Sequence, residues 1–391
     1  MHFSSIDIFC HVIDNFGDAG VVYRFASELK IALPDFRIRV FIDDFKALRE
    51  IAPKLILSEE LREIDKIEYH DSNLMDWGFV EQAGTADVLV EAFACRIPEV
   101  VLEKASRRPT VIINLEYFSA EKWIEGYHLK ESLLGRGELK KYFFMPGITK
   151  GSGGVIINAY MEKFKRQLSD GRPEYFKNFF EKYGLELSDG KDALFGTIFT
   201  YNRGFDTLLT DIQSIDKDFY LFIFGNKSID GMLRTLERKS VHINGSIVKY
   251  GNSQIIFMPF LPQHQYDELL CACDFNIVRG EDSLIRAVLA DKPFLWQAYI
   301  QDDKYQLVKV RAFLDEFKNY FDDKDVWLRF CDVMMQFNDM KKEEPYQKTL
   351  EQYSVFFYDL KKIEGATGKM SYFIRENNNL INNFIDFLVR L

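Results

Sequence analysis

The chain alternates between apolar runs typical of buried strands and segments in which apolar residues recur at helical spacing. This alternation occurs in two separate series. The strand patterns are residues 6–13, 37–42, 86–91 and 110–115 in the first series, and 193–199, 219–224, 254–258 and 275–278 in the second. A helix between successive strands is typical of a parallel sheet covered by helices. The sequence therefore predicts an α/β fold with two Rossmann-like domains facing across a cleft, with ligands at the carboxyl ends of the strands.

The length of 391 residues agrees with two domains, since a domain holds about 150 residues on average. We place the N-terminal domain at residues 1–184, with the charged helical pattern of 158–184 as its connection, and the C-terminal domain at 185–365. Residues 366–391 form a last segment. Its apolar residues Leu380, Phe384 and Leu388 recur at helical intervals, so this amphipathic helix must dock on a domain.

Composition narrows the class of partner. A formal net charge of −10 argues against nucleic acid and against an anionic membrane as the main partner, and local basic groups such as Arg107-Arg108 are interpreted as solvated surface. Five cysteines and six histidines show no metal-ligand spacing, so no metal site is expected. No stretch of about 18 uncharged apolar residues occurs, and the N-terminus has no secretory pattern, so we expect a cytoplasmic, unanchored protein.

The segment Arg279-Gly280-Glu281-Asp282-Ser283 directly follows an apolar strand pattern and opens a helical one. A strand that leads through a glycine into a helix directs free backbone N–H groups and the positive end of the helix dipole at one point, where a phosphate binds. A phosphate alone does not need the two carboxylates at this turn, which are suited to accept hydrogen bonds from hydroxyl groups. The segment therefore indicates a sugar nucleotide, with Ser283 on the diphosphate and Glu281 and Asp282 on ribose or sugar hydroxyls. The alternative is that Asp282 or Ser283 only caps the helix.

Three further segments follow strand patterns in the second series. Phe199 and Tyr201 end its first strand, where the ring of Phe199 can pack beside a ligand and the hydroxyl of Tyr201 can bond a phosphate. Phe260 and Gln263 follow another strand, where an aromatic ring and backbone amides can stack on and recognise a nucleobase. Tyr299 lies at the end of a further strand pattern, residues 291–299. Each residue alone is typical of core or turn, and their joint position at strand ends favours a ligand site.

The first strand-to-helix loop is Asp14-Asn15-Phe16-Gly17-Asp18-Ala19-Gly20. It lacks the glycine spacing of a dinucleotide fingerprint and carries two acids, which disfavours NAD. A carboxylate in this position suits a general base acting on an acceptor. The alternative is that Asp18 is only the N-cap of a helix that starts at Ala19. A second irregular segment, Met145–Gly154, is either a loop near a site or a plain connection.

Taken in order over nearly the whole chain, the strings Asp14–Asp18, Pro262-Gln263 and Arg279–Ser283 resemble those of the bacterial elongation factor P arginine rhamnosyltransferases. The resemblance implies a GT-B glycosyltransferase fold, dTDP-β-L-rhamnose as the donor, and inverting transfer to an arginine side chain of elongation factor P, with no metal or other cofactor. It makes residues 1–184 the acceptor domain and residues 185–365 the donor domain. In GT-B chains the last helix commonly packs back on the N-terminal domain, which is expected here of residues 366–391.

Carried over to this sequence, the resemblance makes Asp18 the general base and Asp14 its essential neighbour. Tyr201, Ser283 and either Arg279 or Arg286 would stabilise the leaving dTDP. The residues expected to bind the donor are Asn15, Phe16, Gly17, Phe199, Tyr201, Phe260, Gln263, Glu281, Asp282, Ser283 and Tyr299. The chain departs from the family pattern after Tyr201, where Asn202-Arg203 stands and an acidic residue is expected.

Two alternatives remain from the sequence. A GT-B-like sugar-nucleotide 2-epimerase shares the architecture but needs acids that eliminate and re-add the nucleotide. A catalytically silent sugar-nucleotide-binding protein would keep its function without Asp18.

Overall fold

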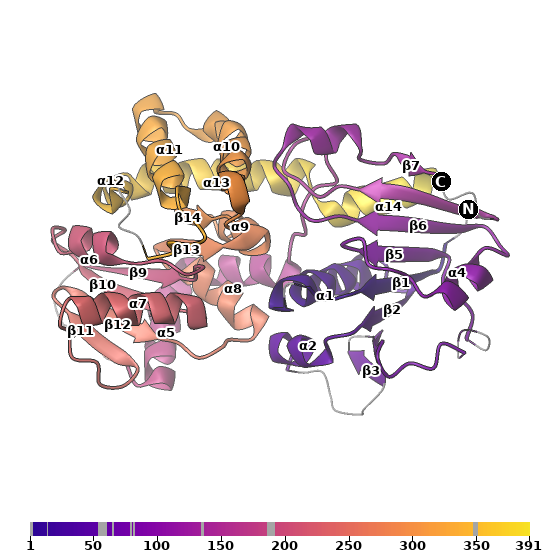
Figure 1. The fold of residues 1–391 in the computed structure, drawn as a ribbon, viewed down its shortest axis with the longest axis horizontal. Helices are drawn as coiled ribbons and strands as arrows, with labels where there is room; N and C mark the ends of the chain where they lie inside the picture. Colours follow the sequence, from indigo (N-terminus) through magenta and orange to yellow (C-terminus); the bar gives the residue numbers. More distant parts are fainter. Residues whose placement is uncertain are drawn as a thin grey trace. The chain divides into compact units, whose positions relative to one another are not determined.

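The computed structural model describes residues 3–13, 15–53, 61–64, 66–78, 80, 83–133, 137–185, 192–346 and 351–391. Two compact units account for the chain. Unit 1 comprises Met1–Ala159 and Ile374–Leu391, and unit 2 comprises Tyr160–Phe373. These bounds differ from the boundaries placed at 184 and 366 from sequence. Each unit is an α/β domain, coloured indigo to magenta and magenta to yellow in Figure 1, with the last yellow helix belonging to unit 1.

Unit 1 contains a sheet whose described strands follow the order β3-β4-β2-β1-β5-β6-β8-β7. Neighbours pair in parallel except at the two edges, where β3 with β4 and β7 with β8 are antiparallel. The strands are β1 Ser5–Cys10, β2 Arg37–Ile42, β3 Leu61–Ile64, β4 Ile67–Asp71, β5 Val88–Ala92, β6 Thr110–Leu115, β7 Glu131–Ser132 and β8 Leu139–Phe144. The helices are α1 Asn15–Ala32, α2 Phe45–Ile51, α4 Glu99–Ala105, the short 3-10 helix η1 Lys122–Gly126, and α14 Leu380–Arg390.

The central strands of unit 1 form its core. Every residue of β1, β5 and β6 is buried, as expected of parallel strands covered on both faces. Strand β1 ends at Cys10, earlier than the predicted 6–13. The backbone amides of Val12 and Ile13 donate to the carboxylates of Asp43 and Asp18, and so do not pair with a neighbouring strand.

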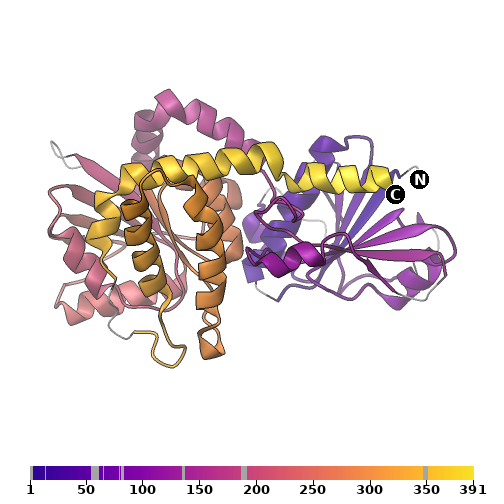
Figure 2. The ribbon, with the colours of Figure 1, turned by 90° about the horizontal axis from the view of Figure 1, so that it is seen from above.

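The last helix, α14, completes this core. Figure 2 shows it along the strands of unit 1. The ring of Phe384 contacts the rings of Phe25 in α1 and Phe144 in β8, with centroids 5.3 and 5.5 Å away, and Phe387 contacts Tyr142. The helix is therefore an integral layer of unit 1.

The segment Met145–Gly154 is a structural connection that holds the start of α14. The Asn378 side chain donates to the carbonyl of Thr149 at 2.8 Å, and the Asn378 carbonyl accepts from Val155 at 2.9 Å. Gly154 has φ +82°, and a Cβ there would lie 2.3 Å from the Asn378 carbonyl oxygen, so the close approach requires glycine.

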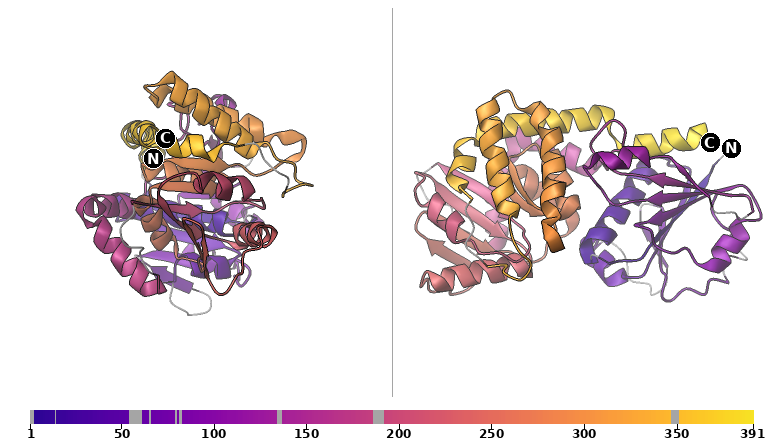
Figure 3. Two further views of the ribbon diagram at one scale, coloured as in Figure 1. Left: turned by 90° about the vertical axis from the view of Figure 1, so that its left-hand side faces the viewer. Right: turned by 45° about the horizontal axis from the view of Figure 1, so that its top comes forward.

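Unit 2 contains a second sheet with the described order β11-β12-β10-β9-β13-β14, parallel except for β11. Its strands are β9 Ala193–Ile198, β10 Asp218–Ile223, β11 Ile247–Tyr250, β12 Ser253–Phe257, β13 Phe275–Arg279 and β14 Phe294–Gln297. Its helices are α5 Ala159–Tyr183, α6 Asp206–Ile212, α7 Asn226–Arg238, α8 Gln263–Ala272, α9 Gly280–Leu289, α10 Gln306–Phe317, α11 Lys324–Asn338, α12 Tyr353–Tyr358 and α13 Leu360–Asn377, with 3-10 helices η2 Asp302–Lys304 and η3 Lys318–Tyr320. Helices α10 and α11 lie side by side (Figure 3).

Aromatic packing explains why α5 belongs with unit 2. Phe176 stacks on Phe195 of β9 with centroids 4.2 Å apart, and Phe179 contacts Phe222 of β10 at 5.3 Å. The apolar face of α5 therefore covers the second sheet. For this reason the contact boundary falls at the start of the helix and not at its end.

Arg203, where the chain departs from the family pattern, is buried in the core of unit 2. Its guanidinium forms an ion pair with the buried Glu351 and lies 3.6 Å from the ring centroid of Phe337. It also donates to the Phe337 carbonyl at 3.0 Å. A buried charge needs such partners. Through them Arg203 holds the segment that begins at Glu351 against the core of unit 2.

Candidate active site

Asp18 lies in the first turn of α1, directly beyond the carboxyl end of β1, and is only 2% exposed. One carboxylate oxygen accepts the backbone N–H of Ile13 at 2.8 Å. The helix begins at Asn15, so the interpretation of Asp18 as the N-cap of a helix starting at Ala19 is wrong. Burial, followed by the Asp18 charge, raises the pKa of the nearby Cys10 thiol, which keeps that thiol protonated.

The rest of this loop is described in part. Asp14 lies outside the described residues, and Asn15 is described only as the first residue of α1. Gly17 is half-buried, and Phe16 is 40% exposed. The structure therefore leaves Phe16 accessible in the same first turn of α1 as the buried Asp18.

A second acidic residue, Asp43, follows β2 at the same edge of the sheet. It accepts the backbone N–H of Val12 at 2.9 Å, and its other oxygen pairs with Nδ1 of His11. The sequence analysis missed this pair. The position of Asp43 directly after a predicted strand was the signal that could have identified it.

Large apolar side chains are exposed in the loops around this edge. Ile13 follows β1, Leu74 follows β4, and Tyr117 follows β6, and their exposures are 71%, 58% and 45%. Tyr117 stacks on Phe93 with ring centroids 4.3 Å apart, and Trp123 of η1 is also exposed. These exposed side chains all come after the carboxyl ends of strands in the unit 1 sheet.

In unit 2, helices α7, α8 and α9 each begin after the carboxyl end of a strand. Their N-cap residues are Gly225, Pro262 and Arg279, and none of the three makes a side-chain cap hydrogen bond. The start of a helix beyond a strand presents backbone N–H groups and the positive end of the helix dipole, which favours an anion. At Gly225, with φ +75°, a Cβ would lie 2.7 Å from the ring of Phe199, so the turn into α7 depends on glycine.

Arg279 joins several predicted donor residues. Its guanidinium lies 4.2 Å from the ring centroid of Phe199 and 4.8 Å from that of Tyr201, and it donates to the Thr200 carbonyl at 3.3 Å. The Tyr201 ring meets that of Tyr299 edge-on at 5.4 Å. Lys227, which the sequence analysis did not single out, lies 5.4 Å from the Tyr201 ring. Two cations and two tyrosines therefore gather beside the start of α9.

The acids of the α9 start are held by basic residues. Glu281 pairs with Lys309 at 3.1 Å, and Asp282 lies 3.7 Å from Arg286. Because α9 begins at Gly280 with Arg279 as its N-cap, Asp282 and the buried Ser283 lie inside the first turn. The alternative that either residue is the N-cap is therefore wrong.

Arg286 links α9 to α8. It donates to Asp267 at 2.6 Å and to the Gln263 carbonyl at 3.1 Å, which ties the start of α8 to the last turn of α9. Phe260, just before α8, is 50% exposed. A cavity of about 390 Å³ is lined by residues that include Ile229, Phe257 and Pro259, the residue before Phe260 in the chain.

Within the described ranges, no cluster of three or more His, Cys, Asp or Glu side chains suited to a metal ion occurs. Among the described helices, none is both long and apolar enough to cross a membrane.

Comparison with known proteins decides the family. The model for the family described as Elongation-Factor P (EF-P) rhamnosyltransferase EarP matches residues 6–389. The chain belongs to the EarP family. Two curated EarP-type relatives are named protein-arginine rhamnosyltransferase. The one from Pseudomonas putida is 33% identical over 82% of this chain and 84% of its own length, and the one from Shewanella oneidensis is 33% identical over 79% of each.

Solved structures agree with the EarP assignment at the level of the fold. A structure from work on EarP-mediated arginine glycosylation of translation elongation factor EF-P covers 99% of both chains with a TM-score of 0.62 at 20% identity. A glycosyltransferase from Rickettsia africae covers 100% of this chain and 98% of its own, with a TM-score of 0.51 at 10% identity. The predicted two-sheet GT-B fold class and the glycosyltransferase assignment are confirmed.

Proposed function

We propose that this EarP family member transfers rhamnose from dTDP-β-L-rhamnose to an arginine side chain of elongation factor P, with inversion at the anomeric carbon. The observation that carries the proposal is the family match over residues 6–389, which includes both the Asp18 loop and the start of α9. The relatives' names supply the sugar and the acceptor side chain.

Unit 2 supports a nucleotide-sugar donor. The diphosphate would bind the uncapped helix starts, with Arg279 and Lys227 close enough to balance its charge. Glu281 and Asp282 would accept hydrogen bonds from sugar hydroxyls, and the Phe260 ring would stack on the base. The proposal assigns no role to a metal ion or cofactor, since the two cations supply positive charge at the leaving group.

Unit 1 supports the attack by arginine. A free guanidinium has a pKa above about 12 and is a poor nucleophile while protonated. The carboxylate of Asp18 would orient it and accept a proton as the C–N bond forms. The C–O bond to the diphosphate breaks in the same displacement, and its electron pair leaves with dTDP. Attack on the face opposite the leaving group inverts the anomeric carbon.

The acceptor protein would contact the exposed apolar residues around Asp18. Ile13, Leu74 and Trp123 offer side chains that are more than half exposed, and Tyr117 is supported by its stack on Phe93. Aromatic residues are enriched at protein interfaces, and the neighbouring acid Asp43 would favour a positively charged arginine-bearing loop.

Ser283→Ala and Asp282→Asn are expected to weaken the binding of dTDP-rhamnose. Each change removes a hydrogen bond or charge at the start of α9, with an expected cost of about 0.5–3 kcal/mol. Isothermal titration calorimetry measures the affinity. The exposed pair Ser169→Ala and Asp170→Asn on α5 provides matched controls within unit 2. Unchanged affinity in both α9 variants would place the donor elsewhere.

Analysis of the sugar nucleotide separates the proposed activity from its alternatives. A transferase consumes dTDP-rhamnose and releases dTDP only when elongation factor P is present. A 2-epimerase alters its sugar nucleotide without any acceptor, and a silent binding protein alters nothing. Chromatography of the nucleotides after incubation with and without the acceptor gives the answer, and turnover that is independent of the acceptor would contradict the proposal.

A further inference from the structure

A cavity of about 510 Å³ lies at the edge of the unit 1 sheet opposite to Asp18. Its lining comprises Ser5, Arg37, Gly84, Thr85, Asp87, Lys104, Arg107 and Arg108. Ser5 and Arg37 are paired first residues of β1 and β2, and Asp87 directly precedes β5. The lining therefore gathers at the amino ends of the strands. The six residues of β1 span about 20 Å, which separates the cavity from the Asp18 loop.

The lining is strongly cationic. It contains four basic side chains and, among the described lining residues, one carboxylate, so its formal charge is three positive. The whole chain carries a net charge of −10, which makes this concentration of positive charge unusual for the protein. A local field of this sign in a recess attracts small anions.

The one lining carboxylate, Asp87, is occupied by internal partners. One oxygen accepts the backbone N–H of Ser4 at 2.8 Å and the hydroxyl of Ser5 at 2.9 Å. The other accepts from Arg108 at 2.8 Å. Burial alone would raise the pKa of Asp87, but these hydrogen bonds outweigh it and lower the pKa, so the group is a carboxylate at neutral pH. Its charge is directed at Arg108.

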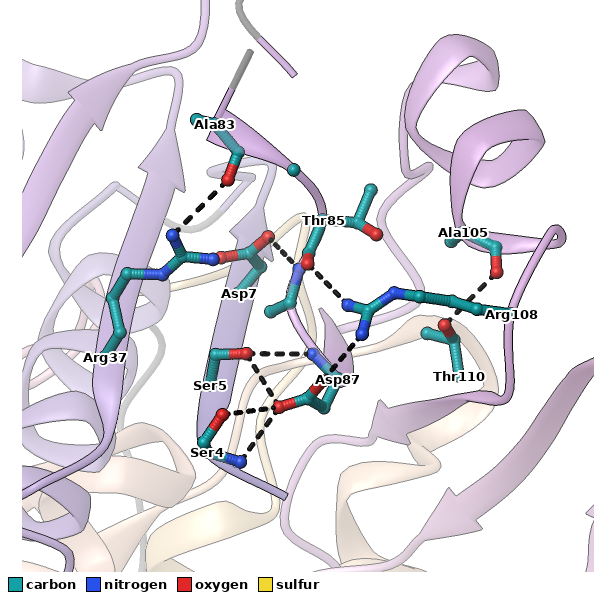
Figure 4. A network of polar contacts seen from close by, with 12 residues as sticks. Ser4, Ser5, Asp7, Arg37, Ala83, Thr85, Asp87, Ala105, Arg108 and Thr110 are labelled. Atoms are coloured by element: carbon teal, nitrogen blue, oxygen red, sulfur yellow. Dashed lines mark hydrogen bonds and ion pairs between the residues drawn. The ribbon is translucent and has the colours of Figure 1, made fainter. Parts of the chain in front are cut away.

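Arg108 is thereby fixed as one wall of the cavity. Besides its bond to Asp87, it donates to the Thr85 carbonyl at 2.5 Å. Figure 4 shows Arg37 and Arg108 on opposite sides of the segment that carries Thr85 and Asp87. Both arginines are among the residues that line the cavity, and this segment runs between them.

Two other cations make weaker contacts. The described side-chain hydrogen bond of Arg37 is a long one, 3.4 Å to the Ala83 carbonyl, and it uses one of five guanidinium donors. Arg107 pairs with Glu103 at 3.1 Å, but both side chains are about two-thirds exposed, and such pairs contribute little. Both residues can turn to a multiply charged ligand at small cost.

We propose that this cavity binds a small phosphate-bearing anion with two or more negative charges. The planar donor fork of arginine matches two oxygens of one phosphate, and several arginines around a recess are typical of phosphate recognition. The volume lies in the range of small-molecule sites, which favours a compact anion over a flat protein contact. The site is separate from the donor residues, which all lie in unit 2 or in the Asp18 loop.

Calorimetric titration of the full chain with pyrophosphate tests the proposal. Arg37→Gln with Arg107→Gln should weaken the binding about tenfold or more, because two charged donors are lost. Arg108 is kept, since it holds Asp87 in place. The control pair, Arg166→Gln with Arg390→Gln, removes the same charge from exposed positions on α5 and α14 and should leave the affinity within about twofold.

Orthophosphate and citrate complete the test. Orthophosphate should bind more weakly than pyrophosphate, and citrate should bind more weakly than both, if the arginine forks select phosphate. The proposal is overturned if pyrophosphate shows no saturable binding, or if binding survives in the cavity variant, as it would at the helix starts of unit 2. Citrate binding as tight as that of pyrophosphate would also overturn the phosphate assignment.

Discussion

Asp18→Asn is expected to lower the rate of rhamnose transfer about 100-fold or more, with little change in donor affinity or melting temperature. The substitution keeps the shape of the side chain and an oxygen that can accept the Ile13 N–H. It removes the negative charge that would orient a guanidinium and the group that would accept its proton. Single-turnover rates with saturating donor measure the loss, because they separate chemistry from binding.

Asp44→Asn provides the matched control for this experiment. Asp44 lies in the next strand-to-helix loop, where its carboxylate caps α2 by accepting the Ala47 N–H at 2.8 Å. Asparagine caps a helix about as well as aspartate, so the control should keep both its rate and its stability. A rate for Asp18→Asn that matches the rate of this control would show that Asp18 is structural only.

Deletion of residues 379–391 is expected to unfold unit 1. The deletion removes five side chains of α14 that are each less than 9% exposed: Leu380, Ile381, Phe384, Phe387 and Leu388. Burial of such a side chain contributes about 1.5–3 kcal/mol, so the group contributes on the order of 10 kcal/mol. That is comparable to the whole stability of a typical domain, about 5–15 kcal/mol. Scanning calorimetry should show loss of a cooperative transition, and transfer activity should be lost with it.

A shorter deletion distinguishes packing from chain length. Removing residues 389–391 takes away the exposed Val389 and Arg390 and the half-buried Leu391, and leaves the five buried side chains of α14 in place, so the melting curve should stay much closer to that of the full chain. If the longer deletion also melts and turns over like the full chain, α14 is dispensable to the core of unit 1, contrary to the packing of Phe384.

The fold could be predicted where strands are buried on both faces. Such strands appear as continuous apolar runs, and the predicted 193–199 and 275–278 agree closely with β9 and β13. The strands β3, β4, β7, β8 and β11 were missed. Of these, β3, β7 and β11 are short strands at sheet edges, and β4 and β8 lie next to an edge and carry charged residues among their apolar ones. The start of α1 at Asn15 was also missed, since Phe16 and Gly17 resemble a turn more than a first helical turn.

From the sequence, the candidate site could be predicted only for residues that directly follow a predicted strand. Tyr201 and Tyr299 both follow strands, and the structure brings their rings together. The position of Arg279 over two aromatic rings, and of Lys227 beside it, depends on side-chain conformation and on contacts between distant segments. Arg203 shows the same limit, because its partner Glu351 lies 148 residues away along the chain.

The intact mass of elongation factor P tests the proposed attachment of rhamnose to one of its arginines. Elongation factor P is incubated with the full chain and dTDP-rhamnose, weighed by mass spectrometry, and fragmented to locate the change. We expect a gain of one deoxyhexose on one arginine, which is absent when the donor is omitted and strongly reduced with Asp18→Asn. An unchanged acceptor mass while an authentic family member modifies the same sample would contradict the proposal.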